Sequence, residues 1–173
     1  MGRKGREIVG PIVDDVIDGL KVSYCNELMA FHYYWYTSLY MQGMGSLTIA
    51  GKFKESAMEE LKHAGIIAER LNQLDAMAPS SPSEWANMSI LGDADPSKYT
   101  TLRSAVEKAL EIEGKAIEHY NELIKKVKDA DYATYDILQD ILVEEVKEEQ
   151  DLEDILAKLE LVEEEGREII EQF

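Results

Sequence analysis

The chain has 173 residues, of which 45% are hydrophobic and 31% are charged, and it carries a net charge of −17 at pH 7. A chain of this length and composition can form one globular domain with a hydrophobic core, and it is not typical of disordered proteins. The negative charge disfavours nucleic acid as a partner, because phosphates need a basic surface. An acidic surface can also keep a protein soluble or attract cations.

The N-terminus carries the only basic cluster of the chain. Residues 1–10 are expected to form a flexible arm that includes Arg3, Lys4 and Arg6, and several copies of such an arm in an oligomer could touch DNA. No apolar stretch resembles a signal peptide or reaches transmembrane length. The single cysteine, Cys25, excludes an internal disulfide. We therefore expect a cytoplasmic protein without membrane contact.

Four long helical patterns follow in chain order, at about 10–42, 47–77, 100–128 and 132–164. Gly43 and Gly45 interrupt the chain between the first and second patterns. Gly166 is expected to end or bend the fourth helix, because glycine is a poor helix former. The sequence thus predicts an all-α protein.

The lengths of the connections predict how these helices are arranged. Short connections join antiparallel neighbours, so the first helix pairs with the second and the third with the fourth. The segment 78–98 is long enough to cross the bundle, and we expect it to contain a short helix at 83–88 that is capped by Ser83. A four-helix bundle with one long crossover is the ferritin-like arrangement, here expected as a single domain over 1–173.

Acidic residues stand in the middle of all four predicted inward faces. Apolar or aromatic side chains precede and follow each acid at helical spacing. His63 follows the acid of the second helix by three residues, and Glu148 follows that of the fourth by three, so each pair shares one helix face. The four central acids are Glu27, Glu60, Glu113 and Glu145.

Such acids need a compensating charge, because an isolated buried carboxylate is very unfavourable. His63 is the only base on these faces, so a pair of divalent cations is the simplest solution. Carboxylates with one imidazole favour iron or manganese over a softer metal. A solvated helix face would be an alternative for Glu60 and His63 alone, but acids on all four inward faces disfavour it.

The sequence resembles the bacterioferritin and Dps-like branch of the ferritin superfamily over residues 19–159. The motifs that carry the resemblance are NELMA at 26–30, ELKHA at 60–64, EGKAIEHY at 113–120 and VEEVKEEQDL at 143–152. The resemblance implies that Glu60 and Glu145 bridge two irons and that Tyr34 and Tyr120 hold ligating carboxylates. The iron ligands that it implies are Glu27, Glu60, His63, Glu113 and Glu145.

The sequence departs from the family pattern at three points. Glu148 replaces the second histidine of the metal site; a glutamate can still ligate iron, so it is kept in the catalytic and metal-binding set. Leu61 stands where bacterioferritins have the methionine that binds haem, so no haem is expected. The cysteine pair of many Dps-like proteins is missing, since its positions fall around Met88 and Lys115.

The resemblance implies a ferroxidase that oxidises and stores iron, with two Fe per chain and with O2 or H2O2 as oxidant. It also implies a homo-oligomer, for which a 12-subunit cage is expected. A rubrerythrin-like di-iron peroxidase without storage is an alternative, although the chain lacks a Cys-x-x-Cys module. A non-enzymatic, DNA-covering oligomer is a second alternative, which the acidic composition disfavours.

Overall fold

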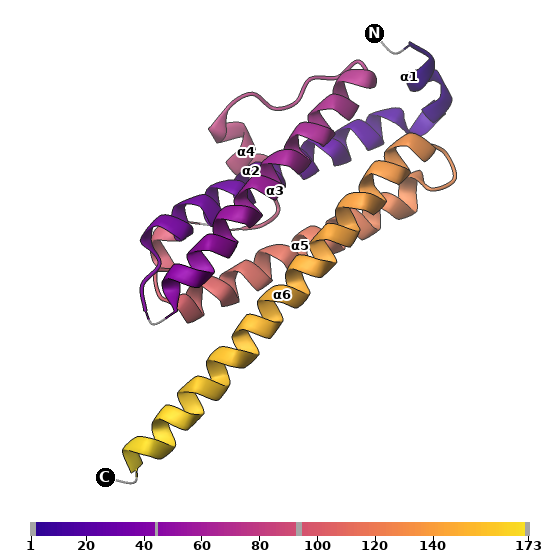
Figure 1. Cartoon of the computed structure of the whole chain (residues 1–173). Coiled ribbons are helices and arrows are strands. Elements are labelled where there is room, and N and C mark those ends of the chain that lie inside the picture. The colour runs from indigo at the N-terminus through magenta and orange to yellow at the C-terminus, as the bar shows by residue number, and fades with distance from the viewer. Residues whose placement is uncertain (1–2, 44, 93–94, 172–173) are drawn as a thin grey trace.

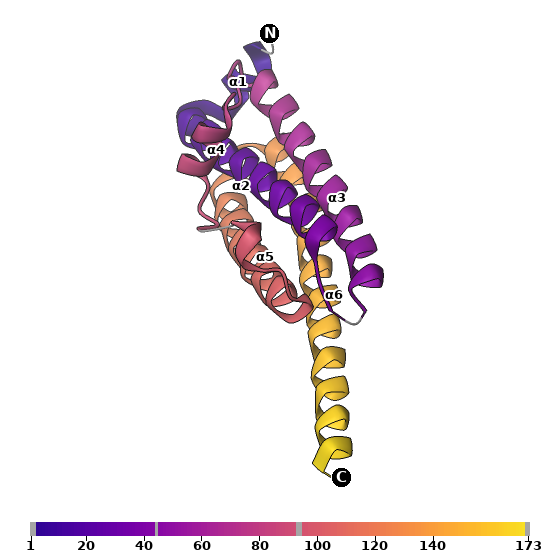
Figure 2. The same cartoon turned by 90° about the vertical axis from the view of Figure 1, so that its left-hand side faces the viewer.

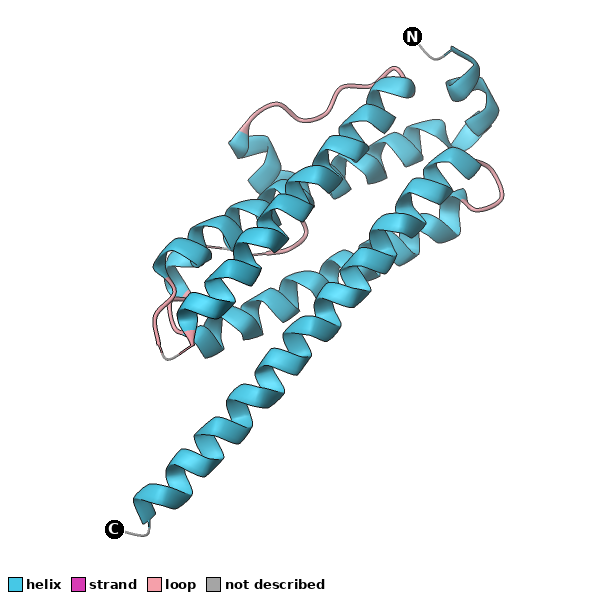
Figure 3. Cartoon of the chain, viewed as in Figure 1, coloured by secondary structure: helices cyan, strands magenta, loops and turns pink. Residues whose placement is uncertain are grey.

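Four long helices form the body of the protein in this computed structural model, which describes residues 3–43, 45–92 and 95–171 (Figure 1). They are α2 over Val13–Tyr40, α3 over Ser46–Gln73, α5 over Leu102–Val127 and α6 over Tyr132–Glu171. The shorter elements are α1 over Arg3–Val9, α4 over Pro82–Met88 and the 3-10 helices η1 over Gly10–Ile12 and η2 over Pro96–Lys98. No strand occurs in the described ranges (Figure 3).

The helices are arranged as two antiparallel pairs, α2 with α3 and α5 with α6 (Figures 1 and 2). The segment between α3 and α5 crosses the bundle, and α4 within it packs against α2. An isolated parallel bridge joins Gln42 to Thr101, so the end of the crossover is fixed to the turn that follows α2. The predicted ferritin-like bundle with one crossover and a short helix inside it is confirmed.

Backbone conformation explains where the first helix pair turns. Gly43 and Gly45 have φ of 119° and 83°, values that favour glycine, and they separate α2 from α3 as predicted. The helix α3 ends at Gln73 rather than near residue 77. Asp75 adopts a left-handed φ of 59°, and the Ala76 N–H donates to the Leu71 carbonyl at 2.9 Å, which closes the helix.

The N-cap of α4 is not the predicted Ser83. The helix begins at Pro82, and Ser81 is its N-cap. The Ser81 hydroxyl accepts from the Glu84 N–H at 3.3 Å, while the Glu84 carboxylate accepts from the Ser81 N–H at 3.0 Å. A proline suits the first helical position, because its missing N–H would have no partner there, so the capping box moves the start by one residue.

The fourth helix does not end or bend off at Gly166 as we expected. It continues to Glu171, and its C-terminal part extends beyond the ends of the other helices (Figures 1 and 2). One glycine lowers helix propensity by only about 1 kcal/mol, which neighbouring residues can outweigh. Leu161 and Val162, in the C-terminal half of α6, are exposed.

The expected N-terminal arm contains a helix. Residues 3–9 form α1, and the Arg6 guanidinium donates to the Leu74 carbonyl at 2.8 Å and to Asp14 at 3.0 Å. Val9 is buried. These contacts attach the described part of the arm to the end of the bundle; residues 1 and 2 lie outside the described residues, and the flexibility of the arm stays a prediction.

The hydrophobic core has two clusters, one toward each end of the bundle. Tyr34 and Phe53 belong to the first, and Leu20 and Ile67 belong to the second. The central acids lie between these clusters in the sequence of every long helix. Among the described residues, no helix has the length and apolar character needed to span a membrane.

Candidate metal centre

Each long helix places its central acid in the interior of the bundle. The glutamates come from α2, α3, α5 and α6, and His63 lies one turn after the acid of α3. All five side chains belong to residues that are between 1% and 5% exposed: Glu27, Glu60, His63, Glu113 and Glu145. Their burial agrees with the inward faces that helical spacing predicted.

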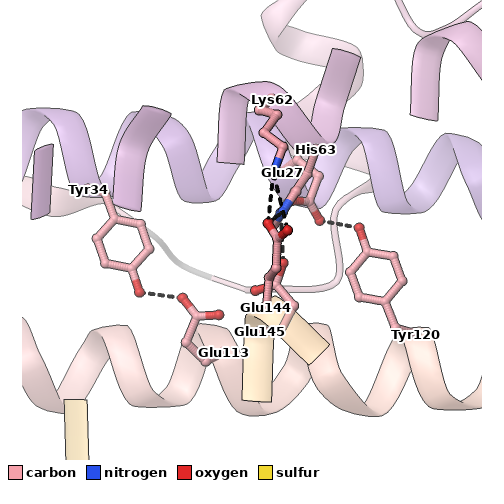
Figure 4. A network of polar contacts seen from close by, with 8 residues as sticks. All are labelled: Glu27, Tyr34, Lys62, His63, Glu113, Tyr120, Glu144 and Glu145. Carbon is pink, nitrogen blue, oxygen red and sulfur yellow. Dashed lines mark hydrogen bonds and ion pairs between the residues drawn. The ribbon is translucent and has the colours of Figure 1, made fainter. Parts of the chain in front are cut away.

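Four of these residues converge on one point. Glu27, Glu60, His63 and Glu145 each offer one ligand atom, and these atoms all lie within 4.8 Å of one another. The Nδ1 atom of His63 lies 2.9 Å from Oε1 of Glu145 and 3.3 Å from Oε2 of Glu27 (Figure 4). Three carboxylate oxygens and one imidazole nitrogen are therefore close enough to one another to bind one cation together.

Four polar atoms of these five buried residues have no hydrogen-bond partner among the described residues, although Nδ1 of His63 forms ion pairs with Glu145 and Glu27 when the imidazole is protonated. They are Oε2 of Glu27, Nδ1 of His63, Oε2 of Glu113 and Oε1 of Glu145. Buried polar atoms without partners are rare in native proteins, because each loses its contacts with water and gains nothing in return. The mixed carboxylate and imidazole set fits iron or manganese, so a cation of this kind would supply the missing partner.

Two tyrosines hold the other oxygens of two glutamates. The Tyr120 hydroxyl of α5 donates to Oε1 of Glu27 on α2, and the Tyr34 hydroxyl of α2 donates to Oε1 of Glu113 on α5. The tyrosines lie on opposite sides of the cluster (Figure 4). Each hydroxyl fixes one carboxylate oxygen and leaves the second oxygen available, which is how outer partners orient metal ligands.

His63 has a further partner that the sequence did not reveal. Its Nε2 atom lies 2.9 Å from Oε2 of Glu144, and Nζ of Lys62 donates to the same carboxylate oxygen at 3.0 Å. A proton on Nε2 satisfies Glu144 and leaves Nδ1 directed at the cluster. The hydrogen bond from His63, followed by that from Lys62, lowers the pKa of Glu144.

Burial and mutual repulsion set the charges of the cluster. Burial raises the pKa values of Glu60 and Glu113 well above the ordinary range, and the charge of Glu145 raises them further. Burial alone would lower the pKa of His63, but the carboxylates of Glu145 and Glu27 outweigh it and raise the pKa to about 11. Without a cation, protons therefore compensate part of the negative charge.

The comparisons with known proteins identify the family of this chain. A protein-family model described as the ferritin-like domain matches residues 17–162. The chain belongs to the ferritin-like domain family. The "DNA protection during starvation protein" of Pyrococcus furiosus is 24% identical over 150 residues, which are 87% of this chain and 81% of that protein.

Solved structures of a bacterioferritin-related protein and of Dps proteins are similar to this ferritin-like chain. A structure described as a dodecameric thioferritin from Bacteroides fragilis has a TM-score of 0.90 and 29% identity, covering 94% of this chain and 98% of its own. The DPS protein of Vibrio cholerae has a TM-score of 0.77 and 16% identity, with 83% of this chain and 90% of that chain covered. The latter likeness shows the shared fold. The resemblance found in the sequence is thus confirmed.

The sixth predicted ligand, Glu148, is outside the group of four converging residues. It is 7% exposed, and both carboxylate oxygens have partners on α3. Nζ of Lys52 lies 2.7 Å from Oε2, and the Ser56 hydroxyl donates to Oε1 at 2.6 Å. A ligand role for Glu148 therefore stays a prediction, and it requires that Lys52 give way.

The metal-free ferritin-like protein is expected to become less stable as the pH rises from 6 to 9. The folded state keeps protons on Glu60, Glu113 and His63 that the unfolded chain has lost, since their folded pKa values are raised. Stability falls with pH wherever the folded state binds more protons.

The melting temperature of protein treated with a chelator, measured at several pH values, should fall by about 5 °C or more over this range. A divalent cation should reverse the trend, because cations bind more tightly as ligands lose protons. A melting temperature that rises with pH in the chelated protein would contradict the assigned proton positions.

Proposed function

We propose that this protein oxidises ferrous iron at the buried carboxylate cluster and stores the oxidised iron. The observation that carries the proposal is the convergence of buried ligand atoms from Glu27, Glu60, His63 and Glu145. Ferrous iron is the substrate, and O2 or H2O2 accepts its electrons. Two ferrous ions supply the two electrons that reduce one peroxide to water.

The protein residues would act by binding and charge. Glu60 and Glu145 are proposed to bridge the two irons, with Glu27 and His63 on one side and Glu113 on the other. Carboxylates stabilise the ferric state more than the ferrous state, because the attraction grows with the charge of the ion. They therefore favour the loss of an electron from each iron.

Storage requires a cavity, which a single chain of this fold does not enclose. The proposed assembly is a homo-oligomeric cage of 12 subunits, supported by the likeness to the thioferritin that is described as dodecameric. The net charge of −17 supports a cation-attracting particle and argues against direct coverage of DNA. Haem is not part of the proposal, because Leu61 has no side-chain atom that could ligate a haem iron.

The experiment that tests this function is anaerobic loading of metal-free protein with Fe²⁺, followed by O2 or H2O2, with native mass measured before and after. We expect about two irons to be oxidised per chain in the first turnover. Repeated additions should then load far more iron into a particle of cage size.

Two outcomes would contradict the proposal in different ways. A small oligomer that never retains more than two irons per chain would indicate a di-iron peroxidase without storage. Protein that binds neither Fe²⁺ nor Mn²⁺ would show that the buried acids are not a metal site.

A further inference from the structure

The two sides of the proposed di-iron site differ in their ligand atoms. On one side, Glu27, His63 and Glu145 present atoms that have no hydrogen-bond partner. On the other side, Glu113 has one oxygen without a partner, whereas both oxygens of Glu148 are engaged. A cation on the first side would replace only the ion pairs of His63 with Glu145 and Glu27, and these three residues are themselves ligands. The second side must first release Glu148.

Lys52 is the residue that holds Glu148. It lies on α3 eight residues, or about two turns, before Glu60, and its Nζ atom is 2.7 Å from Oε2 of Glu148. The charge of Glu148 contributes to the raised pKa values of both Tyr34 and Glu113, so it lies near the second side. The ammonium group therefore compensates a carboxylate near the proposed position of the second cation.

Lys52 also has a second partner nearer the surface. Its Nζ atom lies 3.0 Å from Oδ2 of Asp151, whose side chain is 41% exposed, against 8% for that of Glu148. The Lys52 side chain is itself 26% exposed. A long, flexible lysine can thus move outward and keep one carboxylate partner. Asp151 makes the release of Glu148 less unfavourable than the loss of an isolated buried ion pair.

We propose that Lys52 competes with the second metal ion for Glu148, so that the two irons bind in two unequal steps. This inference rests on the proposed function. The first ion binds at Glu27, Glu60, His63 and Glu145, and the second binds only when the lysine ammonium turns to Asp151. Lys52 is a positioning residue: it sets the affinity of the second step and favours departure of the second ion when it returns to Glu148.

The test is a calorimetric titration of the metal-free protein with Co²⁺, which measures binding without oxidation. The wild-type chain should bind Co²⁺ in two steps, and the affinity of the second step should be at least about tenfold lower than that of the first. Lys52→Met should raise the affinity of the second step at least about tenfold and leave the affinity of the first unchanged. Partners of metal ligands typically change metal affinity by about this factor. Lys52→Arg keeps the positive charge and should keep the weak second step.

Two further variants make the result decisive. Lys54→Met removes the same charge from an exposed residue nearby and should leave both steps unchanged. Lys52→Met leaves a buried carboxylate without its partner and could therefore fold poorly. In that case Lys52→Gln replaces it in the test, because glutamine can still donate a hydrogen bond to Glu148. Lys52→Gln should strengthen the second step in the same direction.

The outcomes separate this inference from the proposed function. If the wild type, Lys52→Met and Lys52→Gln bind Co²⁺ with the same two affinities, the role of Lys52 is overturned and the metal site stands. If Lys54→Met raises the affinity of the second step equally, the effect comes from overall charge, and the proposed role of Lys52 is overturned as well. Absence of Co²⁺ binding in every protein would overturn the proposed metal site, and the role of Lys52 with it.

Discussion

Glu60→Gln is expected to lower the initial rate of ferrous iron oxidation at least about 100-fold. The carboxylate of Glu60 lies within the group of four converging ligands, and it is proposed to bridge the two irons. An amide keeps the size of the side chain but has a single neutral oxygen donor. Removal of outer partners of metal ligands costs about 10- to 100-fold, so loss of a bridging ligand should cost at least the upper value.

The matched control is Glu59→Gln, since Glu59 precedes Glu60 in the same helix and is exposed. This variant should oxidise iron at the wild-type rate. Stopped-flow absorbance of ferric iron after mixing with O2 or H2O2 measures both variants. Unchanged oxidation in Glu60→Gln would show that the reaction takes place elsewhere.

The melting temperature of the metal-free protein shows whether Glu60→Gln has simply failed to fold. Burial makes a charged Glu60 unfavourable, as its strongly raised pKa indicates. A neutral amide of the same size should therefore leave the metal-free protein as stable as the wild type, or more stable. Loss of oxidation at unchanged or higher melting temperature assigns the effect to the ligand.

Helical periodicity and loop length were sufficient to predict the bundle. Apolar positions repeat at helical spacing through all four long helices, and the two short connections and the long one fix which helices are neighbours. The ends of the helices were harder to predict, because each depends on the backbone conformation of a single residue. Asp75 in a left-handed conformation ends α3 early, and Ser81 rather than Ser83 caps α4. The helix α6 also continues past Gly166, because the helix-forming residues around it outweigh one glycine.

The inward acids could be predicted for the same reason, since burial on a helix follows from its face. The burial of Glu27 and Glu145 was predictable, and so was the nearness of Tyr120 to a carboxylate. The contacts of Glu144 with His63 and of Lys52 with Glu148 were not predictable. Glu144 and Lys52 lie outside the apolar stripes of their helices, so the sequence alone suggests that both are solvated charges. Their contacts depend on how α3 and α6 rotate against each other, which no pattern within one helix reveals.

Arg70 was missed in the same way, and it joins the two helix pairs at the end of the bundle. Arg70 and Asp131 are buried, with Nη2 of Arg70 2.8 Å and 2.9 Å from the two carboxylate oxygens. Nε of Arg70 donates to the Thr134 hydroxyl at 2.7 Å. Asp131 also accepts from the Thr134 N–H at 3.0 Å at the start of α6. One buried carboxylate thus orients α6 and binds α3.

Arg70→Met is expected to lower the free energy of unfolding of the metal-free protein by about 3–5 kcal/mol. Breaking one side of a buried ion pair leaves the other charge without compensation, and Asp131 is wholly buried. Urea denaturation followed by circular dichroism measures the change. Arg103→Met is the control: Arg103 pairs with Glu163 at 2.9 Å, but both side chains are partly exposed, so its loss should lower the stability much less than the loss of Arg70.

A double variant separates the ion pair from the helix cap that Asp131 also provides. Asp131→Ser keeps an N-cap side chain while removing the charge, so Arg70→Met combined with Asp131→Ser should recover part of the stability lost in Arg70→Met. Recovery follows because no unpaired charge remains buried. If Arg70→Met cost no more than Arg103→Met, the Arg70–Asp131 pair would not be what stabilises the contact between α3 and α6.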